Sequence, residues 1–113
     1  GKSKDGYRLL QDETIRLMRT EQLTKIAEDP SFWCSSGIGY GYGLGVRTMV
    51  DNRHGQKSPV GEFGWDGAGG CYALCDQASS LSIAFTMQVL GWTGVQDMSH
   101  APIRDGVYEA LSL

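Results

Sequence analysis

Residues that could bind or act on a ligand gather in one short segment, residues 61–70. This segment holds five glycines around Trp65 and Asp66, and an apolar run follows it at residues 71–76. Because glycine has no Cβ, such a segment can adopt positive φ angles and let a ligand or another backbone approach closely. Ordering many glycines costs chain entropy that a simple turn rarely accepts. The residues alone leave two interpretations open: a ligand-binding segment, and a wide hairpin or bulged edge strand.

The cysteines and histidines give little support for a metal site or a disulfide. The chain has three cysteines (Cys34, Cys71 and Cys75) with no Cys-x-x-Cys pair, and its two histidines, His54 and His100, are isolated in sequence. In an extended segment, Cys71 and Cys75 would lie about 13 Å apart, which is too far for a disulfide. We therefore expect no metal site, and we predict that the thiols are reduced and buried.

Composition and charge predict one globular domain without a nucleic-acid or membrane partner. A chain of 113 residues can bury one modest core. The net charge of -3 and the absence of a basic cluster argue against nucleic-acid binding. No apolar run approaches the ~20 residues of a transmembrane helix. Glycines 39, 41, 43 and 45 follow the pattern GxGxGxG rather than GxGxxG, so we expect no nucleotide and no other cofactor.

Hydrophobic periodicity predicts an α+β fold, in which an antiparallel meander of about three strands lies between two helices. The strands are expected at residues 40–50, 71–76 and 81–89. In the first of them the glycines share one face with Arg47 and Met49, and the tyrosines occupy the other. A strand face stripped of side chains would let another element pack closely against it.

The two predicted helices flank this meander. The first covers residues 11–21, where Ile15 and Met18 share one stripe. The second begins at Pro102, a residue favoured in the first helical position. Its apolar side chains recur at helical spacing, at Ile103, Val107, Ala110 and Leu111.

Two glycine-rich segments stand in a fixed order before the last two predicted strands. The first, residues 40–46, reads Tyr-Gly-Tyr-Gly-Leu-Gly-Val, and the second, residues 63–70, reads Phe-Gly-Trp-Asp-Gly-Ala-Gly-Gly. The predicted strands at 71–76 and 81–89 follow. This ordered set resembles the carboxy-terminal part of serine β-lactamase-like hydrolases. That group contains class C β-lactamases, D-Ala-D-Ala peptidases and related esterases. The resemblance runs from the helix at 11–21 through the final helix. It implies a partial β-lactamase-like (penicillin-binding-protein transpeptidase-like) fold.

The resemblance also implies a site. Such enzymes line their cleft with a Lys/His/Trp-x-Gly triplet on a sheet strand, and Trp65-Asp66-Gly67 falls in that place as the substrate-binding triplet. The backbone N–H of Ala68 would then be one of two oxyanion donors. The Trp form is similar to the esterase branches of the group. Asp66 departs from the small or hydroxyl residue that is common in the middle position, and its charge would disfavour anionic β-lactams.

Two other elements of such enzymes are missing from the sequence. No serine precedes a lysine by three positions, and neither Tyr-x-Asn nor Tyr-x-Ser occurs. A catalytic serine needs an adjacent base, so the chain alone is expected to be inert. We therefore expect residues 1–113 to be the carboxy-terminal segment of a larger hydrolase domain, whose amino-terminal part would be its partner.

Two alternatives stay open beside the hydrolase fragment. The chain could be a binding module that uses the groove at Trp65 for a peptide or glycan. It could also be an assembly module that pairs with a second chain, or with its own copies, through exposed strands. The cellular compartment also stays undecided. Reduced cysteines favour the cytoplasm, whereas the family that the chain resembles is often periplasmic or secreted.

Overall fold

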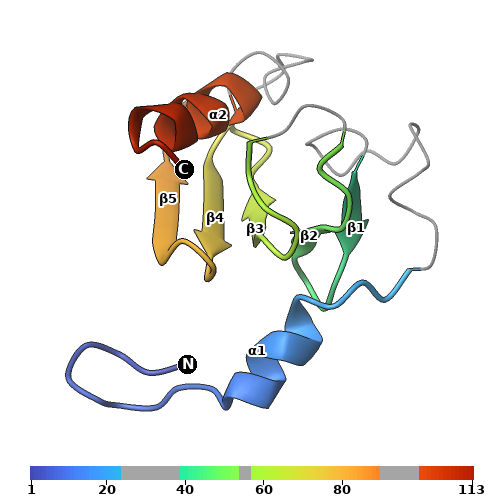
Figure 1. Ribbon diagram of the computed structural model, residues 1–113, viewed down its shortest axis with the longest axis vertical. Helices are drawn as coiled ribbons and strands as arrows, with labels where there is room; N and C mark the ends of the chain where they lie inside the picture. Colours follow the sequence, from blue (N-terminus) through green and yellow to red (C-terminus); the bar gives the residue numbers. More distant parts are fainter. Residues whose placement is uncertain (24–38, 54–56, 90–99) are drawn as a thin grey trace.

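The structure is a computed structural model that describes residues 1–23, 39–53, 57–89 and 100–113. Figure 1 shows a sheet with one helix near each end of the chain. The elements, in chain order, are α1 (Asp12–Met18), β1 (Tyr40–Tyr42), β2 (Arg47–Met49), β3 (Phe63–Asp66), β4 (Tyr72–Asp76), β5 (Leu81–Phe85) and α2 (Ala101–Ala110).

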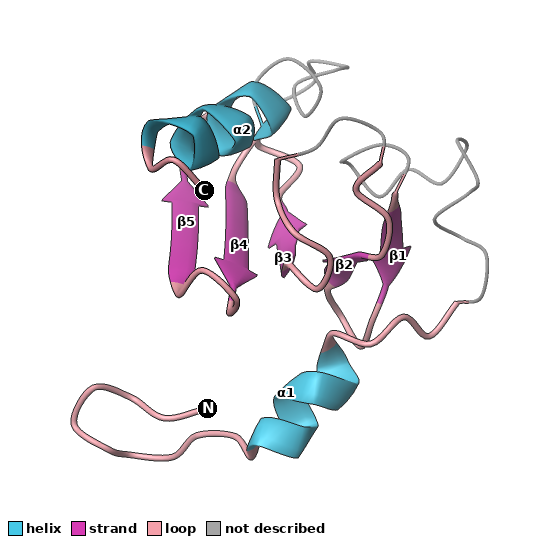
Figure 2. Ribbon diagram, viewed as in Figure 1, coloured by secondary structure: helices cyan, strands magenta, loops and turns pink. Residues whose placement is uncertain are grey.

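The α+β prediction is confirmed. The five strands form one antiparallel sheet in the order β1-β2-β3-β4-β5, so each strand is paired with its neighbour in sequence. Figure 2 shows the strands side by side, with α2 next to β4 and β5 and with α1 near the β1–β2 end. The number of strands is five rather than about three. The predicted first helix is also shorter than expected, because it ends at Met18.

The predicted strand at 40–50 is two strands. β1 and β2 pair with each other in an antiparallel hairpin, with Tyr40 opposite Met49 and Tyr42 opposite Arg47. Residues 43–46 make the turn, and Gly45 adopts a φ of +76° that a side chain would strain. Directly opposed residues share a face of a sheet, so Arg47 lies on the same face as Tyr42. Met49, opposite Tyr40, lies on this face too, so the prediction that Arg47 and Met49 lie on the glycine face is wrong.

The prediction that the glycines admit a close neighbour is confirmed. The segment after α1 packs on the β1–β2 hairpin, where Leu44 N–H donates to the Met18 carbonyl at 2.8 Å. A Cβ added at Gly43 would lie 1.9 Å from that same carbonyl oxygen. A Cβ added at Gly41 would lie 2.8 Å from the Glu21 carboxylate. Close backbone approach is thus the structural reason for glycine at position 43, whereas the neighbour of Gly41 is a side chain and a Cβ at Gly45 would meet open space.

The inward face of α2 is more polar than predicted. Arg104 and Tyr108 are the buried residues of this helix, whereas Ile103 and Val107 are half-buried. Ala110 and Leu111, which were expected to pack on the sheet, are exposed. Arg104 donates to the Tyr40 hydroxyl at 3.0 Å and Tyr108 donates to Asp76 at 3.1 Å. The helix is therefore attached to the sheet by hydrogen bonds as well as by apolar contacts.

The contact between Tyr108 and Asp76 gives a pH-dependent prediction. Burial opposes ionisation of Asp76, but hydrogen bonds from Ser79, Tyr108 and the Ala78 N–H lower the pKa of Asp76 below its ordinary value of 3.8. A lowered folded-state pKa stabilises the fold above the unfolded pKa, and this stability is lost as pH falls through the folded pKa. Tyr108→Phe is expected to cost ~1–2 kcal/mol in free energy of unfolding at pH 7. Urea titrations at pH 7 and pH 3 should show a smaller loss at pH 3, and equal losses would contradict the role of the Asp76 charge.

The cysteine prediction holds only in part. Cys71 and Cys75 are both free thiols, but Cys75 is exposed and Cys71 is half-buried. Side chains alternate along β4, and Tyr72, Leu74 and Asp76 occupy its buried face. The two cysteines therefore fall on the opposite face, which is why the prediction of burial is wrong for them. Cys34 lies outside the described residues.

Candidate functional site

The glycine-rich segment forms the end of β3 and the turn that leads into β4. Within the turn, Gly67 N–H donates to the Cys71 carbonyl at 2.7 Å, and Gly70 N–H donates to the Gly67 carbonyl at 2.9 Å. Gly70 has a φ of +84°. β3 is an interior strand between β2 and β4. The segment is thus a wide hairpin, and the edge-strand interpretation is wrong.

An open pocket of about 260 Å³ lies over the end of this hairpin. Trp65, Asp66 and Gly67 line it together with neighbouring residues of β4 and β5. The paired residues Ala73 and Ala84 contribute small side chains, so the pocket can accept a modest apolar group beside the indole of Trp65. The three residues of the predicted triplet therefore meet at one surface.

Ala68 directly follows Gly67, which lines this pocket. Within the part of the chain that the structure describes, the Ala68 N–H makes no hydrogen bond, and Ala68 is exposed. A Cβ added at Gly67 would meet Cys71 at 3.5 Å, which is ordinary van der Waals contact. The fold itself therefore does not require glycine at position 67. An exposed backbone donor beside a pocket could bind a carbonyl oxygen or an oxyanion.

Asp66 contributes to the pocket without presenting its charge there. Its side chain is only 2% exposed, and its carboxylate lies 3.4 Å from the Arg47 guanidinium. Any contact between Asp66 and a substrate would therefore be made by its backbone. The expectation that its charge repels anionic substrates finds no support in this position, because Arg47 compensates the charge on the buried side.

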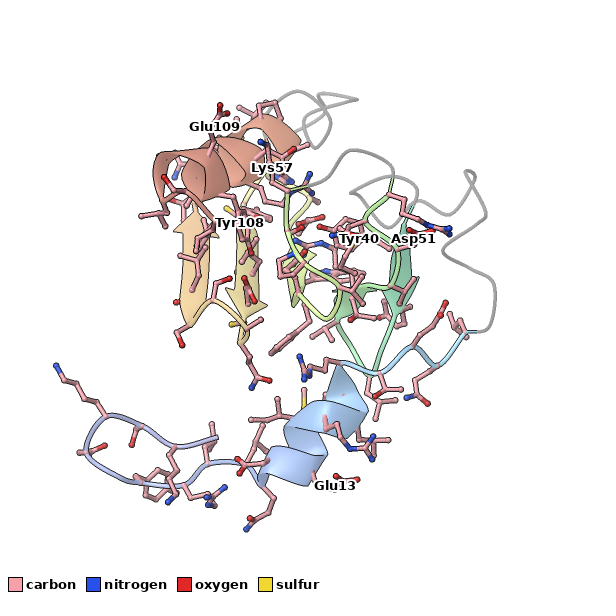
Figure 3. The ribbon with its side chains drawn as sticks, in the orientation of Figure 1. Glu13, Tyr40, Asp51, Lys57, Tyr108 and Glu109 are labelled. Atoms are coloured by element: carbon pink, nitrogen blue, oxygen red, sulfur yellow. The ribbon has the colours of Figure 1, made fainter. Side chains whose placement is uncertain are left out.

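Beneath the strands lies a buried polar cluster, whose member Tyr40 is labelled in Figure 3. Arg47 pairs with Glu62 at 3.4 Å, and both side chains are 0% exposed. The Tyr40 hydroxyl donates to Glu62 at 2.6 Å and accepts a hydrogen bond from Arg104 at 3.0 Å. Arg47 also stacks 5.2 Å from the centroids of the Tyr40 and Tyr72 rings. The cluster joins β1, β2 and α2 into one unit behind the pocket.

The charges in this cluster are held by their neighbours. Burial raises the pKa of the Glu62 carboxyl, although Arg47 and the Tyr40 hydroxyl oppose that effect. Burial alone would lower the pKa of Arg47, but the negative charges of Glu62 and Asp66 raise this pKa above its ordinary value. Arg47 is thus a permanent cation whose two carboxylate neighbours depend on it.

His100, at the start of α2, is buried against the same hairpin. Its Nε2 lies 2.6 Å from the Gly70 carbonyl oxygen. Its ring stacks on Tyr72 with the two centroids 5.1 Å apart. The Nδ1 atom lies 3.8 Å from the Asp66 carboxylate. His100 therefore connects α2 to the turn that carries Ala68.

Sequence reasoning missed Arg47, Arg104 and His100. His100 was dismissed as isolated in sequence, and the two arginines were assigned no role. One signal was present: His100, Arg104 and Tyr108 recur every four residues, so they share one face of a helix. That face could have been recognised as polar and sheet-facing.

Among the described residues, no three His, Cys, Asp or Glu side chains are grouped so that they could hold a metal ion. In the same residues, no helix has the length and apolar character needed to cross a bilayer.

The chain is similar to two curated proteins of Mycobacterium tuberculosis. They are "Protein Rv1367c" of strain H37Rv and "Uncharacterized protein MT1414" of strain CDC 1551, and each is 32% identical over 89 residues. The alignment covers 74% of this chain but only 22% of each relative, so the chain spans about a fifth of their length. No family model matches the chain.

Proposed function

We propose that this chain is the carboxy-terminal segment of a β-lactamase-like serine hydrolase. In this proposal, the end of β3 and its turn form one wall of the active-site cleft. Trp65 and Gly67 would bind the substrate, and the Ala68 N–H would donate to the oxyanion. The nucleophile and its base would come from the amino-terminal part of the enzyme, and the proposed fold is the corresponding part of a β-lactamase-like domain.

The observation that carries this proposal is the arrangement at the β3–β4 turn. Trp65 and Gly67 line one pocket, and the next residue, Ala68, is exposed and has a backbone N–H without a hydrogen-bond partner among the described residues. Acyl-transfer enzymes need such a donor, because charge develops on the carbonyl oxygen in the transition state. The pairing between β2 and β3 ends at Gly64, so Trp65 and Asp66 at the end of β3 extend beyond β2. The much greater length of the mycobacterial relatives is compatible with further segments around this wall.

Covalent labelling tests the proposal. The purified chain is expected to leave every serine unlabelled by a fluorescent penicillin or an activated-ester probe, because it has no Ser-x-x-Lys pair. The longer product of its reading frame should be labelled at a serine that precedes a lysine by three positions. Mass spectrometry of the digested proteins locates the label. Stoichiometric serine labelling of the short chain would contradict the proposal, as would the absence of label on the long product; cysteine labelling decides nothing, since free thiols react on their own.

A second candidate function is assembly through the sheet, and the exposed face of β4 and β5 favours it. Ala73 pairs with Ala84 and Cys75 pairs with Ser82, and all four residues are exposed. β5 is also the edge strand of the sheet that the described residues form, and such an edge invites pairing with another strand. Such a face could receive a second copy of this chain in place of an amino-terminal part.

Self-association is the expected result if this face is free in the purified chain. Light scattering coupled to gel filtration should show a mass that rises with protein concentration. Ala84→Lys, which places a charge in the middle of the face, should shift the equilibrium back to the monomer. A compact monomer at millimolar concentration would rule out the assembly function.

A further inference from the structure

His100 contacts the turn that contains Ala68, and its Nδ1 lies 3.8 Å from the Asp66 carboxylate. Its side chain is only 2% exposed, and its Nε2 lies 2.6 Å from the Gly70 carbonyl oxygen. A carbonyl oxygen can only accept a hydrogen bond, so Nε2 must carry the proton. Stacking on Tyr72 and an edge contact with Phe85 fix the plane of the ring. The donor is therefore aimed by packing from two strands.

The Gly70 carbonyl is one of two points at which the turn is held from outside, beside the Gly69 carbonyl, which accepts from the Val89 N–H at 3.2 Å. Gly70 closes the turn through its own N–H, which donates to the Gly67 carbonyl at 2.9 Å, and it does so with a φ of +84°. Glycine is the most flexible residue, so residues 67–70 gain little rigidity from their own side chains. A hydrogen bond from a buried ring supplies the rigidity from outside. It restrains the peptide plane between Gly70 and Cys71, at the end of the turn that contains the Ala68 N–H.

We propose that His100 is a positioning residue, whose Nε2–H donates to the Gly70 carbonyl and thereby orients the Ala68 N–H toward the pocket. This inference rests on the proposed function, since it makes Ala68 the oxyanion donor. His100 itself touches no substrate. It acts through the turn, because it fixes the orientation of the backbone donor before the substrate binds.

Amide hydrogen exchange of the 113-residue chain tests the effect on the turn. His100→Phe keeps an aromatic ring against Tyr72 and removes the donor. We expect exchange of the Gly67 and Gly70 amides to accelerate about tenfold, which corresponds to one ordinary hydrogen bond. The amides of Leu74 and Ile83, in the middle of β4 and β5, should keep their protection.

Two further variants separate the donor from general packing. His100→Gln, whose amide can donate from a similar position, should restore most of the protection at Gly67 and Gly70. Tyr108→Phe is the matched control on the same face of α2, and it should leave these two amides unchanged. Unchanged exchange in His100→Phe would overturn the proposal. So would equal acceleration at all strand amides, or a failure of His100→Gln to restore protection.

Activity of the reassembled enzyme tests the use of the turn in catalysis. In the chain combined with its amino-terminal part, His100→Phe should lower kcat for a nitrophenyl ester about tenfold with little change in KM, and His100→Gln should recover it. An equal rise in KM would overturn the positioning role. A wild-type assembly without esterase activity would refute the proposed function, whereas the effect of His100 on the turn is decided by exchange alone.

Discussion

Arg47→Met is expected to lower the free energy of unfolding by about 3–5 kcal/mol, the range for removing one partner of a buried ion pair. Arg47 is fully buried, with Glu62 and Asp66 each 3.4 Å from its guanidinium. Methionine fills much of the same volume but removes the cation that both carboxylates face at this distance. The lost compensation of these buried charges, more than the lost contacts, sets the size of the effect.

The controls for this prediction come from the same chain. Arg16 pairs with Glu13 on the exposed face of α1, and both side chains are well exposed. Arg16→Met should therefore change the free energy of unfolding by less than about 0.5 kcal/mol. Adding Glu62→Gln to Arg47→Met should recover part of the lost stability, because it removes one of the two buried charges that Arg47 compensates. Urea denaturation followed by circular dichroism measures all three variants.

The loss in free energy of unfolding caused by Arg47→Met should also depend on pH. Burial already raises the pKa of Glu62 in the folded wild type, and loss of Arg47 removes a group that opposes this. A carboxyl with a raised folded-state pKa favours the fold when it is protonated, and it destabilises the fold as pH rises through that pKa. The difference between wild type and Arg47→Met should thus be smaller near pH 4.5 than at pH 7. A loss that is equal at both values would contradict the assignment to Glu62.

The β1–β2 hairpin shows what sequence periodicity could and could not predict. Alternation of tyrosine and glycine correctly indicated extended chain, and the bare face correctly indicated close packing by another element. The same alternation continues through residues 43–46, where no Asn-Gly or Pro-Gly signal marks a turn. The hairpin places Tyr42 opposite Arg47 on one face, although their alternation along a single strand would separate them. Because the turn was not predicted, Arg47 was assigned to the face of the glycines, whereas it lies on the face of Tyr42.

The candidate site was predictable where it depends on local sequence. Trp65 and Gly67 were recognised because the glycine-rich segment is itself unusual, and they do line one pocket. The support behind them comes from partners far apart in sequence, such as His100 and Gly70. Single-sequence patterns carry no information on contacts of that range, because each partner looks ordinary in its own segment. The buried pairing of Asp66 was not predicted for the same reason, since its partner Arg47 lies in another strand.

Gly67→Val is the variant expected to have the largest effect on catalysis in the proposed hydrolase. In the chain combined with its amino-terminal part, it should lower turnover of short nitrophenyl esters by about 10²–10³, comparable to the loss of one oxyanion donor. The physical reason is steric, because a branched side chain at Gly67 would stand where the substrate must approach the Ala68 N–H. Since a Cβ at this position makes only ordinary contact with Cys71, the variant should still fold. Its urea midpoint checks that point directly.

Two neighbouring variants give this prediction its specificity. Ala68→Ser should be mild, because the proposed donor is the backbone N–H and the side chain of Ala68 is exposed. Trp65→Ala should mainly alter the preference among ester chain lengths, since its indole forms one wall of the pocket. Near-normal turnover in Gly67→Val, together with loss of activity toward every ester in Trp65→Ala, would show that the triplet is misplaced. The indole of Trp65, rather than the backbone at Ala68, would then be the essential contact of this wall.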